Sequence, residues 1–258
     1  MPLSGGRTVV RSLLVRGMLA GLAAGLIAFV FAYVFGEPAV NGGIAFEEQL
    51  AAAHEHGEAG EALVSRGVQS TLGLLTGVLV YAVAVGGILA LVYAATRGRF
   101  GPARPRAAAL VLAAAGFVAV ILVPFLKYPG NPPASSDDGS IGQRTGLYLV
   151  MVLFSVLVAV LATALGRALA ARLGTWNATL AAVGAYLLVV LIGGALLPVV
   201  DETPADFPAT VLYDFRIASL GLHVVLWAAL GLVFGALVER GVRRGSAGGG
   251  MPLTRRTP

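Results

Sequence analysis

Residues 67–96, GVQSTLGLLTGVLVYAVAVGGILALVYAAT, contain no Asp, Glu, Lys or Arg. A helix of about 20 apolar residues crosses a hydrocarbon core about 30 Å thick, so this run is long enough to span a membrane. Helices suit such runs because they satisfy every backbone hydrogen-bonding group within the segment. The stretch therefore predicts a transmembrane helix.

Five further runs share this lack of charge: 17–36, 107–126, 145–166, 173–200 and 217–238. The whole chain is 57% hydrophobic and 12% charged, whereas a soluble domain carries about 25% charged residues. We expect an all-α polytopic membrane protein with one transmembrane domain at 1–240 and a disordered tail at 241–258. The expected helices lie at about 12–36, 67–95, 107–127, 145–171, 176–199 and 215–239.

The distribution of charge predicts the orientation of these six helices. Of the 18 basic residues, 14 lie at the N-terminus, in 97–106, in 167–172 and at the C-terminus. These segments contain a single acidic residue, Glu239. The other 12 acids lie in the alternate segments. The positive-inside rule then places both termini in the cytoplasm, with three consecutive helical hairpins in the cell membrane. The same segregation of charge indicates the lipid bilayer as the partner, and not nucleic acid.

Three arginines, Arg66, Arg144 and Arg216, immediately precede the helices that return from the acidic side, and each follows a loop that contains proline. Such a side chain can extend to lipid headgroups. Alternatively, it can pair with a loop carboxylate and hold the loop over the bundle. Carboxylates available for that second role include Glu61, Asp138 and Asp214.

Small residues recur four positions apart in the expected helices. The first helix has Gly17, Gly21 and Gly25, and the second has Gly73 and Gly77. This spacing lets helix backbones approach closely in lipid, so we expect these glycines to mediate helix packing.

The acidic segment 37–66 is the expected first extracytoplasmic loop, and it holds two of the three histidines. Imidazole and carboxylate together suit a divalent first-row metal. The candidate metal ligands are Glu47, His54, His56 and Glu58. If residues 44–63 are helical, all of them except His56 fall on one face. A solvated acidic loop that only contributes to topology is the alternative.

The third histidine, His223, lies inside the sixth expected helix. An ionisable group within the membrane is a functional candidate, although a neutral histidine packed between helices is the alternative. Together with Ser219, Gln69 and Ser70, it provides a polar path through the outer half of the bundle. Ser219 and His223 lack a third catalytic group, so we do not expect an enzyme. The single lysine, Lys127, excludes a Walker A loop.

Several longer motifs are similar to those of a known family. They are LLVRGMLAGLAAGLIAFVFAYVFGEP, AFEEQLAAAHEHGE, VSRGVQSTLGLLTG, VPFLKYPGNPP, LGTWNATL and ADFPATVLYDFRIASLG. With them the chain resembles, over about residues 11–238, the CbtA family of predicted cobalt transporters. The resemblance implies cobalt uptake for cobalamin synthesis, and it implies CbtB, a small single-span protein with a His-rich end, as a partner.

The leading hypothesis is therefore a permease component for a divalent transition metal, with capture at the Glu/His loop. Acidic loops raise the local concentration of cations, and the membrane potential favours entry by about 2.3 kcal/mol per charge per 100 mV. We expect no tightly bound cofactor, because cobalt or a similar divalent cation is the transported ligand. The alternative is a non-transporting scaffold or accessory subunit that binds a partner membrane protein. A homo-oligomer is compatible with both.

Overall fold

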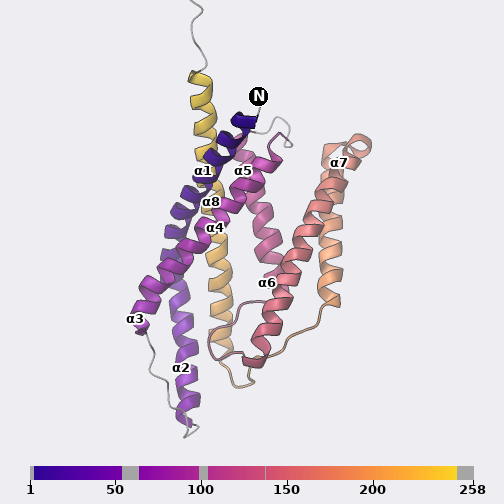
Figure 1. Ribbon diagram of the computed structural model, residues 1–258. Coiled ribbons are helices and arrows are strands. Elements are labelled where there is room, and N and C mark those ends of the chain that lie inside the picture. The colour runs from indigo at the N-terminus through magenta and orange to yellow at the C-terminus, as the bar shows by residue number, and fades with distance from the viewer. Residues whose placement is uncertain (1–2, 54–63, 99–103, 137, 249–258) are drawn as a thin grey trace, which may run out of the picture. The chain divides into compact units, whose positions relative to one another are not determined.

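The computed structural model describes residues 3–53, 64–98, 104–136 and 138–248, and within these ranges the regular structure is entirely helical, with no β-strand (Figure 1). Five helices are long and apolar enough to cross a membrane. They are Thr8–Ala53, Arg66–Thr96, Pro105–Lys127, Gly139–Leu196 and Ala209–Arg244. The expected all-α class is confirmed.

Each of the first three long helices is interrupted by a π-helical turn, whereas the last two contain none. In chain order the elements are α1 (Leu3–Phe31), η1 (Ala32–Gly36), α2 (Glu37–Ala53), α3 (Arg66–Val68), η2 (Gln69–Gly73), α4 (Leu74–Thr96), α5 (Pro105–Gly116), η3 (Phe117–Leu122), α6 (Val123–Lys127), α7 (Asp138–Leu196) and α8 (Ala209–Gly248).

Two of the π turns end one residue short of the residue that precedes a proline, at Gly36 before Glu37 and Pro38 and at Leu122 before Val123 and Pro124. The residue before Pro38 donates its N–H to the carbonyl of Ala32, and the residue before Pro124 donates to the carbonyl of Val118. Proline has no N–H, and its ring clashes with the carbonyl four residues earlier, which would break an α-helix. The wider π turn is a local adjustment that allows the helix to continue past the proline.

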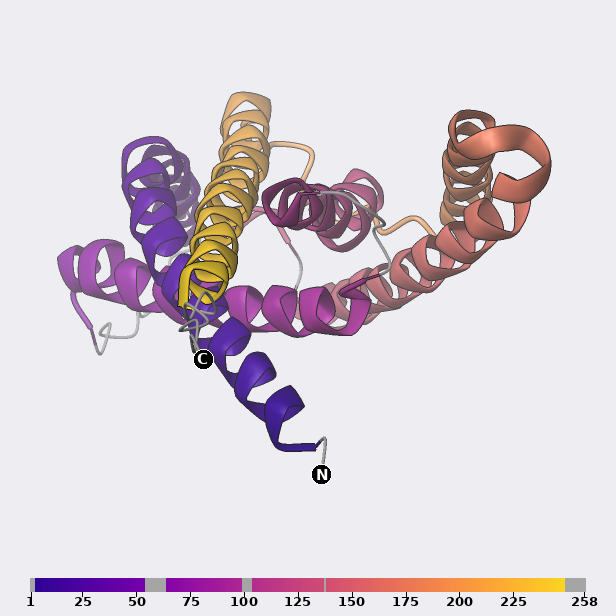
Figure 2. The ribbon, with the colours of Figure 1, turned by 90° about the horizontal axis from the view of Figure 1, so that it is seen from above.

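The helix α7 reverses direction at Gly174, whose φ of 73° and ψ of 161° are not helical. Positive φ is readily available only to glycine. The two arms lie side by side in both views (Figures 1 and 2), and Ser155 and Tyr186 on opposite arms are hydrogen-bonded at 2.8 Å. The two helices expected at 145–171 and 176–199 are therefore arms of one element that turns at a single residue.

Two helices extend into segments that were expected to be loop or tail. The helix that begins with α1 continues through η1 and α2 to Ala53, so the first half of the acidic segment 37–66 is helical. Ala, Glu and Gln are strong helix formers and dominate its last turns. The helix α8 likewise continues to Gly248, and residues 249–258 of the expected tail lie outside the described part of the chain.

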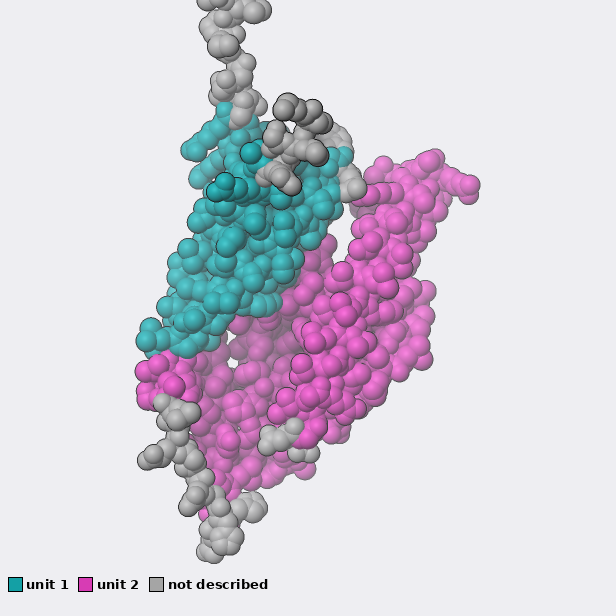
Figure 3. Space-filling model, viewed as in Figure 1, with its two compact units in different colours: residues 1–30, 71–114, 225–258 teal, residues 31–70, 115–224 magenta. Residues whose placement is uncertain are grey.

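The chain divides into two compact units (Figure 3). Unit 1 comprises residues 1–30, 71–114 and 225–258, and unit 2 comprises residues 31–70 and 115–224.

Unit 1 packs α1 against α4 by direct backbone contact. A Cβ atom on Gly17 would overlap the carbonyl oxygen of Gly86, and a Cβ on Gly21 would overlap that of Ala82. Gly86 was not singled out from the sequence, whereas a Cβ on Gly77 would meet nothing within 4 Å. The close approach therefore depends on residues that lie further along α4 than the expected pair of glycines.

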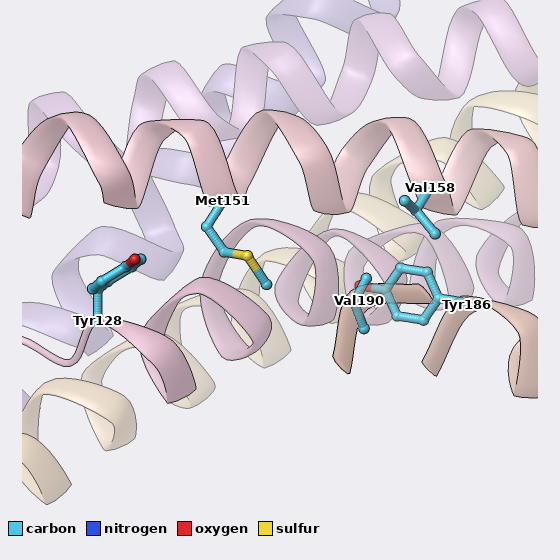
Figure 4. Close-up of a cluster of buried hydrophobic side chains, with 5 residues drawn as sticks. All are labelled: Tyr128, Met151, Val158, Tyr186 and Val190. Carbon is cyan, nitrogen blue, oxygen red and sulfur yellow. The ribbon is translucent and has the colours of Figure 1, made fainter. Parts of the chain in front are cut away.

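Unit 2 contains a buried cluster between α6 and the two arms of α7 (Figure 4). Met151 and Val158 from the first arm face Tyr186 and Val190 from the second arm, and Tyr128 follows the end of α6. The Tyr128 hydroxyl also donates to the carbonyl of Pro198 at 2.7 Å. The cluster thus fixes the two loops that begin at Tyr128 and at the end of α7.

Candidate functional site

A polar site with a buried carboxylate surrounds Glu202, in the loop between α7 and α8. Its side chain is only 3% exposed. The carboxylate accepts hydrogen bonds from Ser136 at 2.9 Å and from Asn131 at 3.0 Å, and it is also in close contact with Ser140 and Arg144. A buried carboxylate is costly unless it is paired and hydrogen-bonded, and this shell provides both.

Two elements supply these donors. The loop 128–136, YPGNPPASS, carries Asn131 and Ser136, and its backbone is constrained by three prolines and by Ala134 at a positive φ of 60°. Ser140 and Arg144 lie four residues apart near the start of α7, so they share one helix face. A constrained loop and a helix end therefore converge on one carboxylate.

Asn131 connects the buried carboxylate to a second arginine. Its side-chain oxygen accepts a hydrogen bond from Arg216 at 2.8 Å, while its side-chain nitrogen donates to Glu202. Arg144 contacts the same oxygen of Glu202 that Asn131 does. The result is a continuous chain of contacts, here called the Glu202 network, from Arg216 on α8 through Asn131 and Glu202 to Arg144 on α7.

The environment of Glu202 favours its ionised form. Burial alone raises the pKa of this carboxyl, but hydrogen bonds from Ser140, Arg144 and Ser136, together with the charge of Arg144, outweigh that effect and hold the pKa below its ordinary value of 4.5. Glu202 is therefore negatively charged at neutral pH, and Arg144 neutralises it.

Two cavities border the Glu202 network. One, here called the cationic cavity, has a volume of about 310 Å³. Its polar lining includes Lys127, Asn131, Arg144, Asp201, Glu202 and Arg216. The other has a volume of about 600 Å³ and is lined by Glu47 of α2 as well as Asn131, Ser136 and Arg144.

The third arginine at a helix return, Arg66, forms a separate cluster with the start of α2. Its guanidinium contacts Glu37 closely and donates to Asn41 at 3.0 and 3.2 Å. Arg66 therefore connects α3 to the first turns of α2.

Each of the three arginines thus contacts a polar group from a different segment of unit 2, but the partners differ from the carboxylates that the sequence suggested. Arg66 contacts Glu37, Arg144 contacts Glu202, and Arg216 contacts the amide of Asn131. Within the described part of the chain Arg216 forms no ion pair, with Asp214 or any other carboxylate. Glu61 and the side chain of Asp138 lie outside it.

A family model described as "Probable cobalt transporter subunit (CbtA)" matches residues 10–239, which is most of the chain. The chain belongs to the CbtA family. This confirms the resemblance seen in the sequence, and it makes the chain a multi-pass helical membrane protein of a transporter family and not an enzyme. No curated protein and no solved structure matches the chain.

The residues predicted to capture metal in this CbtA-family chain are only partly described. Glu47 is exposed on α2, while His54, His56 and Glu58 lie outside the described residues. Within the described ranges, no group of three or more His, Cys, Asp or Glu side chains is placed to hold a metal ion. The Glu/His capture site therefore stays a prediction.

The polar residues predicted to line a path occupy two elements of unit 2. Gln69 and Ser70 lie in η2, where their side chains donate to the carbonyls of Val64 and Gly67 at 3.0 and 3.3 Å. Ser219 and His223 are half-buried and lie one turn apart on α8. Gln69 and Ser70 thus bond to their own segment.

Sequence reasoning missed Glu202, Asn131 and their serine partners. The spacing of four residues between Ser140 and Arg144, near the start of a helix, is the sequence feature that could have indicated that the two side chains act together. Asn131 stood in the quoted motif VPFLKYPGNPP, but nothing in the sequence linked it to an acid 71 positions away.

Proposed function

We propose that this CbtA-family chain is a permease component that takes up a divalent transition-metal ion, with cobalt as its substrate. The family match over residues 10–239 is the observation that carries this proposal. The five long apolar helices supply the membrane body that such a component needs. The family resemblance further implies that the cobalt supplies cobalamin synthesis.

In this proposal the chain crosses the cell membrane six times, because the reversal of α7 at Gly174 turns one long helix into two crossings. Both termini then face the cytoplasm, in keeping with the 14 basic residues of the terminal and alternate segments. Residues 1–240 form one transmembrane domain. The Glu202 network and the Arg66 cluster lie on the extracytoplasmic side.

Metal ions first meet the acidic segment, where Glu47, His54, His56 and Glu58 form a transient capture site. The exposure of Glu47 on α2 supports its access to solvent. The ion then passes the polar side chains of the outer half of the bundle. These are Gln69, Ser70, Ser219 and His223.

The three arginines at the helix returns hold the extracytoplasmic segments over the bundle. The contacts of Arg66 with Glu37, of Arg144 with Glu202 and of Arg216 with Asn131 support this role. Each joins segments that are distant in sequence, separated by 29, 58 and 85 positions respectively.

The alternative is an accessory subunit or scaffold that acts through a partner membrane protein, and the word "subunit" in the family description favours it. An apolar groove in unit 1 offers a surface on which a partner helix can pack. Its volume is about 520 Å³, and its lining includes Met18, Leu79 and Gly87. A small His-rich single-span protein of the CbtB type, or a second copy of this chain, is the partner under this alternative.

Uptake of labelled cobalt by liposomes that contain the purified chain separates the two functions. We expect uptake by the chain alone, and a raised KM with little change in maximal rate when both His54 and His56 are replaced by alanine. Glu47→Gln tests the proposed capture carboxylate that lies on α2, with Glu48→Gln as its matched control, since both are exposed and adjacent. His223→Ala is expected to lower the maximal rate.

Unchanged uptake in the double histidine variant contradicts the capture site, and unchanged uptake in His223→Ala contradicts the intramembrane role. If the wild-type chain alone moves no cobalt, and uptake starts only when a co-purifying membrane protein is added, the accessory function replaces the permease.

A further inference from the structure

The cationic cavity contains more positive charge than its own acids neutralise. Three cationic side chains, Lys127, Arg144 and Arg216, and two acidic ones, Asp201 and Glu202, line it. Glu202 is already in contact with Arg144. In the described part of the chain, neither Lys127 nor Arg216 forms an ion pair with a carboxylate. A concave site with an excess of one charge attracts ions of the opposite sign.

Arg216 also has an unused hydrogen-bond donor. One terminal nitrogen donates to Asn131, but the Nε atom is buried and has no acceptor among the described residues. A buried donor without a partner is destabilising. The planar guanidinium carries several N–H donors in a fixed arrangement that matches the multiple acceptor oxygens of carboxylate and phosphate groups. An oxyanion in the cavity would supply the acceptor that this N–H lacks.

The same features argue against a metal ion in this cavity. Two guanidinium groups and an ammonium group repel a divalent cation, and no metal-holding group of acids or histidines occurs in the described ranges. The volume of about 310 Å³ exceeds the roughly 30 Å³ that one water occupies in the liquid, so an anion of several atoms fits.

We propose that the cationic cavity of unit 2 binds a small oxyanion of the phosphate type, held by Arg216, Lys127 and Arg144. This site goes beyond the proposed permease function and does not depend on which metal the chain carries. Lys127 and Arg216 lie near the ends of two candidate spans, Pro105–Lys127 and Ala209–Arg244, where lipid phosphates meet water. A lipid headgroup and a free anion share this chemistry, and the experiment separates them.

The test uses the purified full-length chain in detergent, with two measurements. The first is its melting temperature in inorganic phosphate against chloride at equal ionic strength. The second is native mass spectrometry of retained phosphatidylglycerol against phosphatidylcholine. We expect phosphate or phosphatidylglycerol to bind the wild-type chain. We expect Arg216→Gln and Lys127→Gln each to weaken that binding about tenfold, as loss of one charge-assisted hydrogen bond predicts.

Arg172→Gln is the matched control, because Arg172 is exposed on α7 and does not line the cavity. Arg216 also holds Asn131, so its variant can lose stability for that reason alone. The Nζ atom of Lys127 lies 5.7 Å from the centre of the Tyr128 ring, and Lys127 donates no hydrogen bond to the described residues, so its variant reports on the anion independently.

Stabilisation of the delipidated chain by phosphate identifies a free anion as the ligand. A lipid headgroup is the ligand if the chain retains phosphatidylglycerol, if Lys127→Gln weakens that retention, and if phosphate does not displace the lipid. The proposal is overturned if the wild-type chain binds neither ligand. It is equally overturned if Lys127→Gln and Arg172→Gln behave like the wild-type chain in both measurements.

Discussion

The two compact units of the chain use different means of holding their helices. In unit 1, backbone meets backbone, because Gly17 and Gly21 of α1 leave no room for a side chain against α4. In unit 2, a proline-rich loop, a helix end and a second loop converge on the buried carboxylate of Glu202. Unit 1 therefore depends on the small size of its residues, whereas unit 2 adds charge and hydrogen bonding between distant segments to its buried apolar cluster.

This difference matters because the two kinds of contact tolerate change differently. A lipid-embedded contact between small residues gains from close van der Waals packing and is sensitive to added volume. A buried ion pair is sensitive to the loss of either partner, since the remaining charge is then unpaired. Variants chosen in each unit should therefore fail in different ways.

Glu202→Ala should cause the greatest loss of stability in the molecule. It leaves Arg144, which is only 23% exposed, without its partner, and it removes an acceptor from Asn131, Ser136 and Ser140. Breaking a buried pair in this way costs about 3–5 kcal/mol, and the partial exposure of Arg144 favours the lower end. The free energy of unfolding in mixed micelles measures it.

Glu47→Ala is the control for that variant, because Glu47 is an exposed acid of the same unit and should change stability by less than about 0.5 kcal/mol. Equal stability of the two variants would show that the Glu202 network does not hold unit 2 together.

Gly86→Leu should disrupt the contact between α1 and α4. Its Cβ alone would overlap the carbonyl oxygen of Gly17, and overpacking of this kind costs about 1–3 kcal/mol. Gly77→Leu adds the same side chain to the same helix, where a Cβ meets nothing within 4 Å. Unfolding of both variants in parallel checks the comparison, and a Gly77→Leu chain as unstable as Gly86→Leu would contradict it.

Tyr186→Phe should destabilise unit 2 by about 0.5–1.5 kcal/mol. The change removes the hydroxyl that is hydrogen-bonded to buried Ser155 at 2.8 Å between the two arms of α7. Tyr213→Phe removes a hydroxyl from a side chain that is 65% exposed, and it serves as the control. Thermal unfolding of the two variants should separate them, and coincident melting curves would indicate that the bond between the arms contributes nothing.

The effect of pH on the Glu202 network should be the smallest. The pKa of Glu202 is held below 4.5 in the folded chain, so the carboxylate contributes its full stabilisation above 4.5 and loses it as the pH falls through the lower folded value. The difference in stability between wild type and Glu202→Gln should thus stay constant from neutral pH to 4.5 and shrink in more acidic solution. A difference that already shrinks near neutral pH would contradict this assignment.

The helical class and the approximate places of the long apolar helices could be predicted because charge-free runs are a local property of the sequence. The arginine partners could not be predicted in the same way. Arg144 meets Glu202 across 58 positions, and Arg216 meets Asn131 across 85. Such pairs are set by how the loops fold back on the helices, and no periodicity in the chain encodes them.

The glycine contacts show a similar limit. With 35 glycines in the chain, spacings of four arise often, so the pattern at Gly73 and Gly77 did not identify the face of α4 that meets α1. The extension of the first helix to Ala53, by contrast, had a visible local signal in its Ala, Glu and Gln content. Composition predicted the helices better than it predicted how they pair.

The π turns before Pro38 and Pro124 make the number of residues in these segments important. A π turn closes its hydrogen bond one residue further along the chain than an α turn does. Deleting one residue within 32–36 would let the wide turn close into an α-helical one, and the ring of Pro38 would then clash with the carbonyl four residues earlier. A shortened chain should therefore be harmed more than a chain with conservative substitutions at the same positions, since the additional residue lets the helix continue past the proline.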